Sequence, residues 1–143
     1  MISEFKGEFR FLSNFWPAKV DYEGLEFGNV ETAYQASKFE PRFRARFVKM
    51  SPTEAKKAGK GMGNDEWESR KLEIMELLIR KKFSIPELSA LLKSTGNEEL
   101  VEGNWWGDQY WGMCRGVGEN RLGKILMKIR GELKGDDKNV STH

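Results

Sequence analysis

The sequence has very little cysteine and histidine, with one residue of each, Cys114 and His143. A single cysteine cannot form a disulfide within the chain, and it cannot supply the several thiolates of a cysteine-rich zinc site. A single histidine at position 143 leaves no His-based metal site, no Ser-His-Asp triad and no imidazole general base. Any chemistry therefore depends on Glu, Asp, Lys, Tyr or Ser side chains, or on backbone groups.

Long apolar runs are also missing. No segment approaches the roughly 20 apolar residues that a membrane helix needs. The N-terminal stretch Met1-Ile2-Ser3-Glu4-Phe5-Lys6 has no apolar core of signal-peptide length. We therefore expect a cytoplasmic protein that does not engage a membrane.

The chain also lacks a strong excess of either positive or negative charge. The 24 Lys and Arg residues and 22 Asp and Glu residues give a net charge of +2. A field this weak does not by itself predict a nucleic-acid partner. Two locally basic stretches, 42–46 and 80–82, remain candidates for a basic groove, although such stretches are more often solvated helix faces.

The length of 143 residues is typical of one domain. We expect one domain over residues 1–134 and a polar C-terminal tail over 135–143. The fold class expected is α+β, predominantly helical, with a small antiparallel hairpin near the N-terminus. Alternating residues around Glu23-Gly24 predict the hairpin. A short strand or extended segment is expected at 9–12, and another short strand at Leu100-Val101.

Helices are predicted from start signals and apolar spacing. Asn29 and Ser51 are expected to cap two of them, and Asp65 is expected to cap the longest. The predicted helices cover residues 30–39, 41–50, 51–59, 65–82, a segment that begins near 84–86, and 119–133.

The helix predicted at 30–39 places four larger side chains within one arc of about 100°. They are Glu31, Tyr34, Gln35 and Lys38. Because the opposite face carries small residues, the backbone can approach the body of the protein closely. The arc is therefore either an ordinary polar surface stripe or the lining of a pocket.

The segment from Glu102 to Gly112 mixes aromatic, acidic and glycine residues. Three Trp, one Tyr, two acids and three Gly fall within these eleven positions. Glycine allows close backbone approach, and Trp offers flat faces for a base or a ribose. The alternative is a tight loop whose Trp residues plug the core. The Gly-rich turn at 116–121 adds a weak signal for phosphate binding at a helix start.

These stretches together resemble the NADAR family, the YbiA-like domain. The resemblance runs from about Phe9 to Arg130, and the order and spacing of its motifs are specific. The motifs are Phe11-Leu12-Ser13-Asn14-Phe15, residues 30–38 (Val-Glu-Thr-Ala-Tyr-Gln-Ala-Ser-Lys), Asp65-Glu66-Trp67-Glu68, Lys82-Phe83, residues 100–104, Trp106-Gly107-Asp108, Tyr110-Trp111-Gly112 and residues 118–127.

The resemblance implies an N-glycosidase that acts on phosphorylated ribose attached to nitrogen. Family members are tied either to early riboflavin-pathway intermediates or to removal of ADP-ribose from guanine bases. It implies that Glu31 and Lys38 line the catalytic centre, with Trp67, Trp106, Asp108, Trp111 and Asn120 around the substrate. Residues that share these motifs complete the expected substrate-binding set: Phe11, Ser13, Asn14, Phe15, Tyr34, Gln35, Glu102 and Gly112. Relatives often have an Arg where this chain has Met62-Gly63-Asn64, and Lys60 is the candidate substitute.

Cleavage of a ribosyl C–N bond builds positive charge on the anomeric carbon and the ring oxygen. Glu31 is our candidate to stabilise that charge or to act as a base, and Asp108 or a bound water could protonate the leaving nitrogen. Lys38 either pairs with phosphate or a ribose hydroxyl, or attacks the sugar as a neutral amine and forms an imine. We expect no cofactor and no metal.

Expected partners are an ADP-ribose-like or phosphoribosyl small molecule, or ADP-ribosylated DNA. Two alternatives stay open. One is a non-catalytic module that binds ADP-ribose or a nucleotide. The other is a helical scaffold, which would require the segment from Trp106 to Trp111 to be dry and fully packed.

Overall fold

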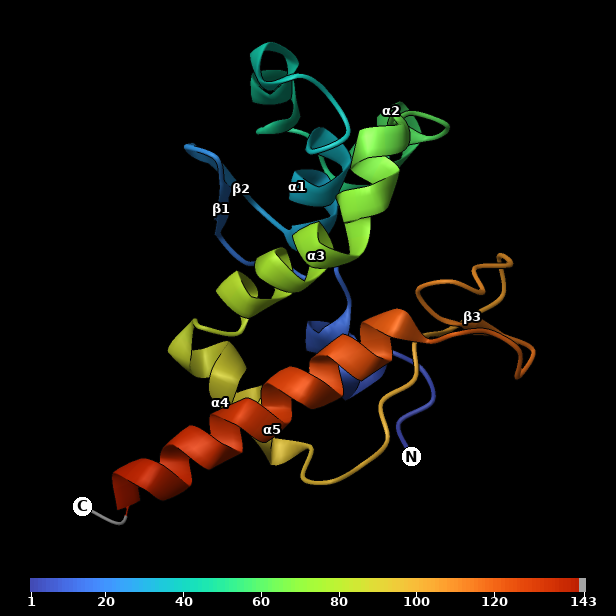
Figure 1. The fold of residues 1–143 in the computed structure, drawn as a ribbon. Helices are drawn as coiled ribbons and strands as arrows, with labels where there is room; N and C mark the ends of the chain where they lie inside the picture. The colour runs from blue at the N-terminus through green and yellow to red at the C-terminus, as the bar shows by residue number, and fades with distance from the viewer. Residues whose placement is uncertain (142–143) are drawn as a thin grey trace. The chain divides into compact units, whose positions relative to one another are not determined.

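The computed structural model describes residues 1–141, and their backbone contacts divide the chain into two compact units. Unit 1 joins Met1–Ser13 to the segment that begins at Ile85, and unit 2 is Asn14–Ser84. Helices dominate both units, and a small antiparallel hairpin lies near the N-terminus, as the sequence predicts (Figure 1). Among the helices of residues 1–141, none combines the length and apolar character needed to cross a membrane.

Unit 2 begins with the predicted hairpin. Strand β1 (Val20–Tyr22) pairs with β2 (Leu25–Phe27) in antiparallel register, with Tyr22 opposite Leu25. The two turn residues, Glu23 and Gly24, both adopt left-handed backbone angles, with φ of 45° and 88°. A two-residue turn of this hand matches the twist of the strands.

Helix α1 (Val30–Ala36) follows the hairpin and is buried along its whole length. Asn29 caps it as expected, since its Oδ1 accepts a hydrogen bond from the Thr32 amide at 2.7 Å. A helix of seven residues is too short to be stable alone. Its stability comes from this cap and from packing on α2 (Pro52–Gly59) and α3 (Asp65–Lys82), which flank it within unit 2 (Figure 1).

Several helix boundaries in unit 2 differ from the sequence prediction. Helix α1 ends at Ala36 rather than near Phe39, and the segment from Pro41 forms a 3-10 helix, η2 (Pro41–Phe47). The Ser51 capping box is present. Asp65 does not cap α3, because the Asn64 side chain instead accepts a hydrogen bond from the Trp67 amide at 2.8 Å. Asn64 is one position earlier and already has the extended backbone that an N-cap needs.

Unit 1 contains η1 (Gly7–Leu12), α4 (Pro86–Ser94), β3 (Gly103–Asn104), β4 (Met113–Cys114) and α5 (Arg121–Ser141). Residues 9–12 were expected to be extended, but they lie in the 3-10 helix η1, which buries Phe11 and Leu12. The strand expected at Leu100-Val101 is reduced to one bridge, between Leu100 and Ile2. The parallel pair β3–β4 is a feature that the sequence pattern did not indicate.

Helix α5 is longer than expected. It begins at Arg121 and continues past Leu133 to Ser141, so it includes most of the segment expected to form a polar tail. With 21 residues it exceeds the 18 of α3, which was expected to be the longest helix. The last two residues of the expected tail, 142–143, lie outside the described part of the chain.

Candidate functional site

The four polar residues predicted to share one face of α1 do not form a surface stripe. Glu31, Tyr34 and Gln35 are only 8%, 6% and 5% exposed, and Lys38 is half-buried just beyond the end of the helix. Buried polar groups of this size need partners. The surface-stripe alternative is therefore wrong, and the face is a packed polar cluster.

Glu31 and Gln35 are joined directly. Gln35 Nε2 donates to Glu31 Oε1 at 2.8 Å, which fixes the carboxylate one helical turn from the amide. Among the described residues, Gln35 Oε1 is the buried side-chain oxygen or nitrogen that has no hydrogen-bond partner. Gly59 lies against it, because a Cβ built on Gly59 would be 1.9 Å from this oxygen.

Lys38 lies in an aromatic setting. Its Nζ is 5.2 Å from the Trp67 ring centroid and 5.7 Å from that of Tyr34, and it donates to the Gly59 carbonyl at 3.0 Å. Burial lowers the pKa of Lys38 below its ordinary value of 10.5, although Glu31 and Glu68 act in the opposite direction. A larger fraction of this amine is therefore neutral at a given pH than for an exposed lysine.

Trp67 is held in place by two features that spacing alone does not reveal. Its Nε1 donates to Ser37 Oγ at 2.9 Å, and Ser37 in turn donates to the Tyr34 carbonyl at 2.5 Å. Gly63 has a φ of 105°, and a Cβ there would be 2.8 Å from the indole. In the helix predicted to reach Phe39, Ser37 would lie on the face of small residues, whereas the regular helix ends one residue before it.

The segment Met62-Gly63-Asn64, where the resemblance implies an Arg, contains residues with local structural roles. Gly63 makes room for Trp67, and Asn64 caps α3. Lys60, the candidate substitute for a phosphate contact, is exposed directly after α2. The two remaining expected substrate-binding residues of unit 2, Asn14 and Phe15, lie before α1. The Asn14 carbonyl accepts a hydrogen bond from the Glu31 amide at 3.1 Å, and Phe15 is 38% exposed.

In unit 1, Asp108 organises the segment from Glu102 to Gly112, which we call the Trp-rich loop. Its Oδ1 accepts the amides of Tyr110 and Trp111 at 3.0 and 2.9 Å. The Asn104 side chain donates to the Asp108 carbonyl at 2.8 Å and accepts from the Asp108 amide at 3.0 Å. It also donates to the Glu102 carboxylate at 3.1 Å. Within the described residues, Asp108 Oδ2 accepts no hydrogen bond.

The glycine and asparagine of this region are fixed by close contacts. A Cβ on Gly112 would be 1.8 Å from a Glu102 carboxylate oxygen, so no other residue fits there without a shift. Asn120 is buried, with φ of 50°, and bridges the Glu102 amide and the Leu100 carbonyl at 3.0 and 2.9 Å. Both residues shape the loop.

The tryptophans of this loop do not plug a core. Trp105 is 80% exposed and Trp106 is 47% exposed, while Trp111 is partly buried with its ring edge-on to Tyr110 at 4.8 Å. The core-plug and dry-scaffold alternatives are therefore wrong for this segment. In the N-terminal motif, Phe11 is part of the buried core of unit 1, and Ser13 is half-buried.

Glu31, Tyr34, Gln35, Lys38 and Trp67 thus form one cluster in unit 2, and Glu102, Asp108, Trp111, Gly112 and Asn120 are connected in unit 1. Between residues 1 and 141, no three His, Cys, Asp or Glu side chains are grouped so that they could hold a metal ion. The cluster in unit 2 offers a carboxylate, an amine of lowered pKa and two aromatic faces. These are groups suited to charge stabilisation and nucleophilic chemistry on a sugar.

Comparisons with known proteins show the family to which the chain belongs. The NADAR domain model matches residues 3–134. N-glycosidase YbiA of Escherichia coli (strain K12) is 38% identical over 130 residues, covering 85% of this chain and 79% of that protein. N-glycosidase Npun_R5314 of Nostoc punctiforme is 33% identical over 132 residues, covering 85% and 84%.

A further relative is the chloroplastic riboflavin biosynthesis protein PYRR of Zea mays, which is 38% identical over 145 residues. The match covers 86% of this chain but only 23% of the maize protein. The solved NMR structure of E. coli YbiA superposes with a TM-score of 0.81 at 32% identity and covers 96% of this chain and 87% of that one. The chain therefore belongs to the NADAR domain family, as a YbiA-like N-glycosidase.

Proposed function

We propose that this chain hydrolyses a ribosyl C1′–N bond in a phosphoribosylamino compound of the kind formed early in the riboflavin pathway. The relatives supply the first support, since N-glycosidases and riboflavin biosynthesis proteins are both among them. ADP-ribosylated guanine is the second substrate to test, because it carries the same ribosyl C1′–N bond. The observation that carries the proposal is the half-buried Lys38 amine of lowered pKa, within the electrostatic reach of Glu31.

Glu31 is the group that we assign to the developing positive charge. When the bond from C1′ to nitrogen lengthens, charge accumulates on C1′ and on the ring oxygen, and a fixed carboxylate stabilises it. The hydrogen bond from Gln35 holds the carboxylate in one orientation before substrate arrives. Such preorganisation is worth several kcal/mol in comparable sites, on the order of 10²–10³ in rate.

Lys38 is the group that we assign to covalent catalysis. Its neutral Nζ adds its lone pair to C1′, while the leaving nitrogen departs with the bonding electrons and takes a proton. Loss of the amine proton and opening of the sugar ring then give an imine between Nζ and C1′. Water hydrolyses the imine, which returns the amine and releases the open-chain sugar. The lowered pKa favours this role over simple pairing with phosphate.

The residues of the Trp-rich loop enter the proposal as substrate contacts. Asp108 can offer only Oδ2 to a ligand without losing its loop bonds. We propose that Asp108 in its protonated form, or a bound water, gives a proton to the leaving nitrogen. The exposed Trp106 ring is suited to stacking on a base, and Lys60 to a phosphate contact. The roles proposed for Trp106 and Lys60 are supported by the chemistry of their side chains and by their exposure to solvent.

The test is a product assay with both substrates, the ribosylaminopyrimidine and ADP-ribosylated guanine, for the wild type, Glu31→Gln and the exposed control Glu66→Gln. We expect turnover of the pyrimidine compound by the wild type and the control. Glu31→Gln should lose at least about 100-fold in kcat and keep its substrate affinity.

Two results would contradict the proposal. Binding of either compound without any turnover by the wild type would indicate a non-catalytic module. Turnover of ADP-ribosylated guanine alone would retain the enzyme class and overturn the assigned substrate.

A further inference from the structure

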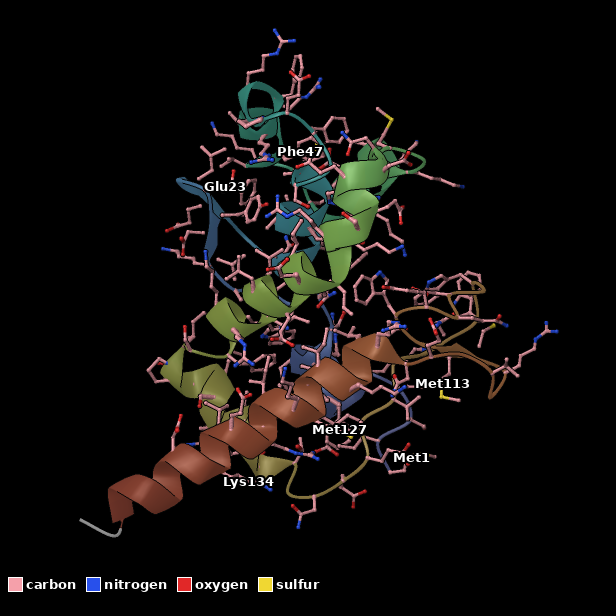
Figure 2. All side chains as sticks on the ribbon, in the orientation of Figure 1. Met1, Glu23, Phe47, Met113, Met127 and Lys134 are labelled. Carbon is pink, nitrogen blue, oxygen red and sulfur yellow. The ribbon has the colours of Figure 1, made fainter. Side chains whose placement is uncertain are left out.

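Unit 2 contains a cavity of about 230 Å³ between the hairpin and α3, formed by residues that the proposed reaction does not use. Tyr22 and Glu23 line it from the hairpin, and Glu23 lies at the hairpin tip (Figure 2). Helix α3 provides the remaining lining residues: Arg70, Glu73, Ile74, Leu77 and Lys81.

Two of the charged residues at this cavity already have partners. Lys81 Nζ donates to the Asp21 carbonyl at 2.7 Å and to its carboxylate at 3.2 Å. Glu23 accepts from Arg44 at 2.6 Å. These two pairs leave little net charge at the hairpin side of the cavity.

The other two charged residues have no such partners. Among residues 1–141, neither Arg70 nor Glu73 has a side-chain hydrogen bond or an ion pair, although nearby residues of α3 do. The Glu68–Lys71 pair of the same helix is 2.8 Å apart, and the Glu76–Arg80 pair is 3.2 Å apart. Positions 70 and 73 are neighbours on the helix surface. Arg70 and Glu73 are exposed, so the open side of the cavity carries one cation, near Tyr22, and one anion that are not hydrogen-bonded to protein groups within residues 1–141.

The rest of the lining is apolar. The Tyr22 ring is 3% exposed, and the Arg44 guanidinium is 5.2 Å from its centroid. Ile74 is buried, and Leu77 is 43% exposed, which is high for a leucine. This wall can cover about one ring or one branched chain, since the volume is below the roughly 300–1,000 Å³ of sites for drug-sized molecules.

We propose that this cavity binds a small zwitterion with an apolar body, such as an α-amino acid with an apolar side chain. Its carboxylate pairs with Arg70, its ammonium group pairs with Glu73, and its side chain packs on Tyr22, Ile74 and Leu77. The two opposite charges of the ligand, on groups bonded to one carbon, match two opposite charges at positions i and i+3 of one helix face. The site is separate from the Glu31 and Lys38 cluster, and this inference does not depend on the proposed reaction.

The experiment is an NMR titration of the ¹⁵N-labelled full chain with L-phenylalanine. Two analogues, 3-phenylpropionate and phenethylamine, each lack one of its charges. Phenylalanine should give saturable shifts at the amides of residues 22, 74 and 77, and each analogue should bind about two- to fivefold more weakly. Absence of saturable shifts at these amides would overturn the proposal.

Two variants test which residue pairs with each charge of the ligand. Arg70→Gln should weaken phenylalanine and phenylpropionate by about two- to fivefold and leave phenethylamine unchanged. Glu73→Gln should show the reverse selectivity, and Glu66→Gln on the same helix should bind all three as the wild type does. Equal binding by the wild type, Arg70→Gln and Glu73→Gln would contradict the assigned pairing even if phenylalanine binds.

Discussion

At the residue scale, the two lysines with lowered pKa values have different surroundings. Lys38 is half-buried and touches two rings and a carbonyl, whereas Lys82 is 1% exposed near the end of α3. Burial lowers the pKa of Lys82 from 10.5 to about 7. The prediction that residues 80–82 form a solvated helix face is therefore wrong for Lys82.

The Lys82 pKa predicts how stability depends on pH. Between about pH 7 and 10.5 the unfolded chain keeps a proton that the folded chain releases, so the free energy of unfolding rises with pH across that window. Below pH 7 both states are protonated, and the cost of burying the charge is present in full, on the order of 3–5 kcal/mol.

Lys82→Met should therefore raise the free energy of unfolding at pH 7 by about 2–4 kcal/mol and remove that part of the pH dependence. Urea unfolding of the wild type and the variant at several pH values measures it, with the exposed Lys57→Met as the control. A variant that is less stable than the wild type at both ends of the window would refute this role for burial.

The Lys38 pKa makes a separate prediction for the pH dependence of turnover. A nucleophilic amine must be neutral, so kcat should rise with pH and level off above the Lys38 pKa, which is below 10.5. Lys38→Arg keeps the positive charge but cannot act as a nucleophile near neutral pH, and it should lose at least about 100-fold in kcat. A pH-independent kcat, or a Lys38→Arg variant of wild-type activity, would favour simple charge pairing.

At the element scale, α1 depends on how closely α2 approaches it. Gly59, the last residue of α2, contacts Gln35, and its carbonyl accepts a hydrogen bond from the Lys38 amine. Gly59→Ala would place a methyl group 1.9 Å from Gln35 Oε1, so the Gln35 side chain must shift. That shift would disturb the hydrogen bond from Gln35 to the Glu31 carboxylate, to which we assign the stabilising role.

We expect Gly59→Ala to lower the free energy of unfolding by about 1–3 kcal/mol and to lower kcat as well. Denaturant unfolding and the product assay measure the two effects. Gly28→Ala is the matched control, because its added methyl group would meet no atom within 4 Å. Unchanged stability and kcat in Gly59→Ala would show that the contact is not required.

The elements also show what local sequence signals can predict. The Asn29 cap, the Ser51 capping box and the Glu23-Gly24 turn depend on interactions within a few residues, and all three are present. The end of α1, the 3-10 form of residues 7–12 and the parallel pair at Gly103 and Met113 depend on packing between distant segments. Periodicity carries no information about those contacts.

At the scale of the whole molecule, composition indicated which chemistry to exclude, and motif order indicated the family, which the comparisons confirm. The burial of Glu31, Tyr34 and Gln35 could not be predicted, because a polar arc on a helix is compatible with solvent or with a pocket. Ser37 and Gly59 were missed as supports of the cluster, since their roles arise only when α1, α2 and α3 pack together.

The most direct test of the central claim is borohydride reduction during turnover, followed by peptide mass analysis. We expect a reduced sugar adduct on Lys38 in the wild type, and no adduct on any lysine in Lys38→Arg. Full turnover without an adduct on Lys38, or an adduct on another lysine, would contradict it.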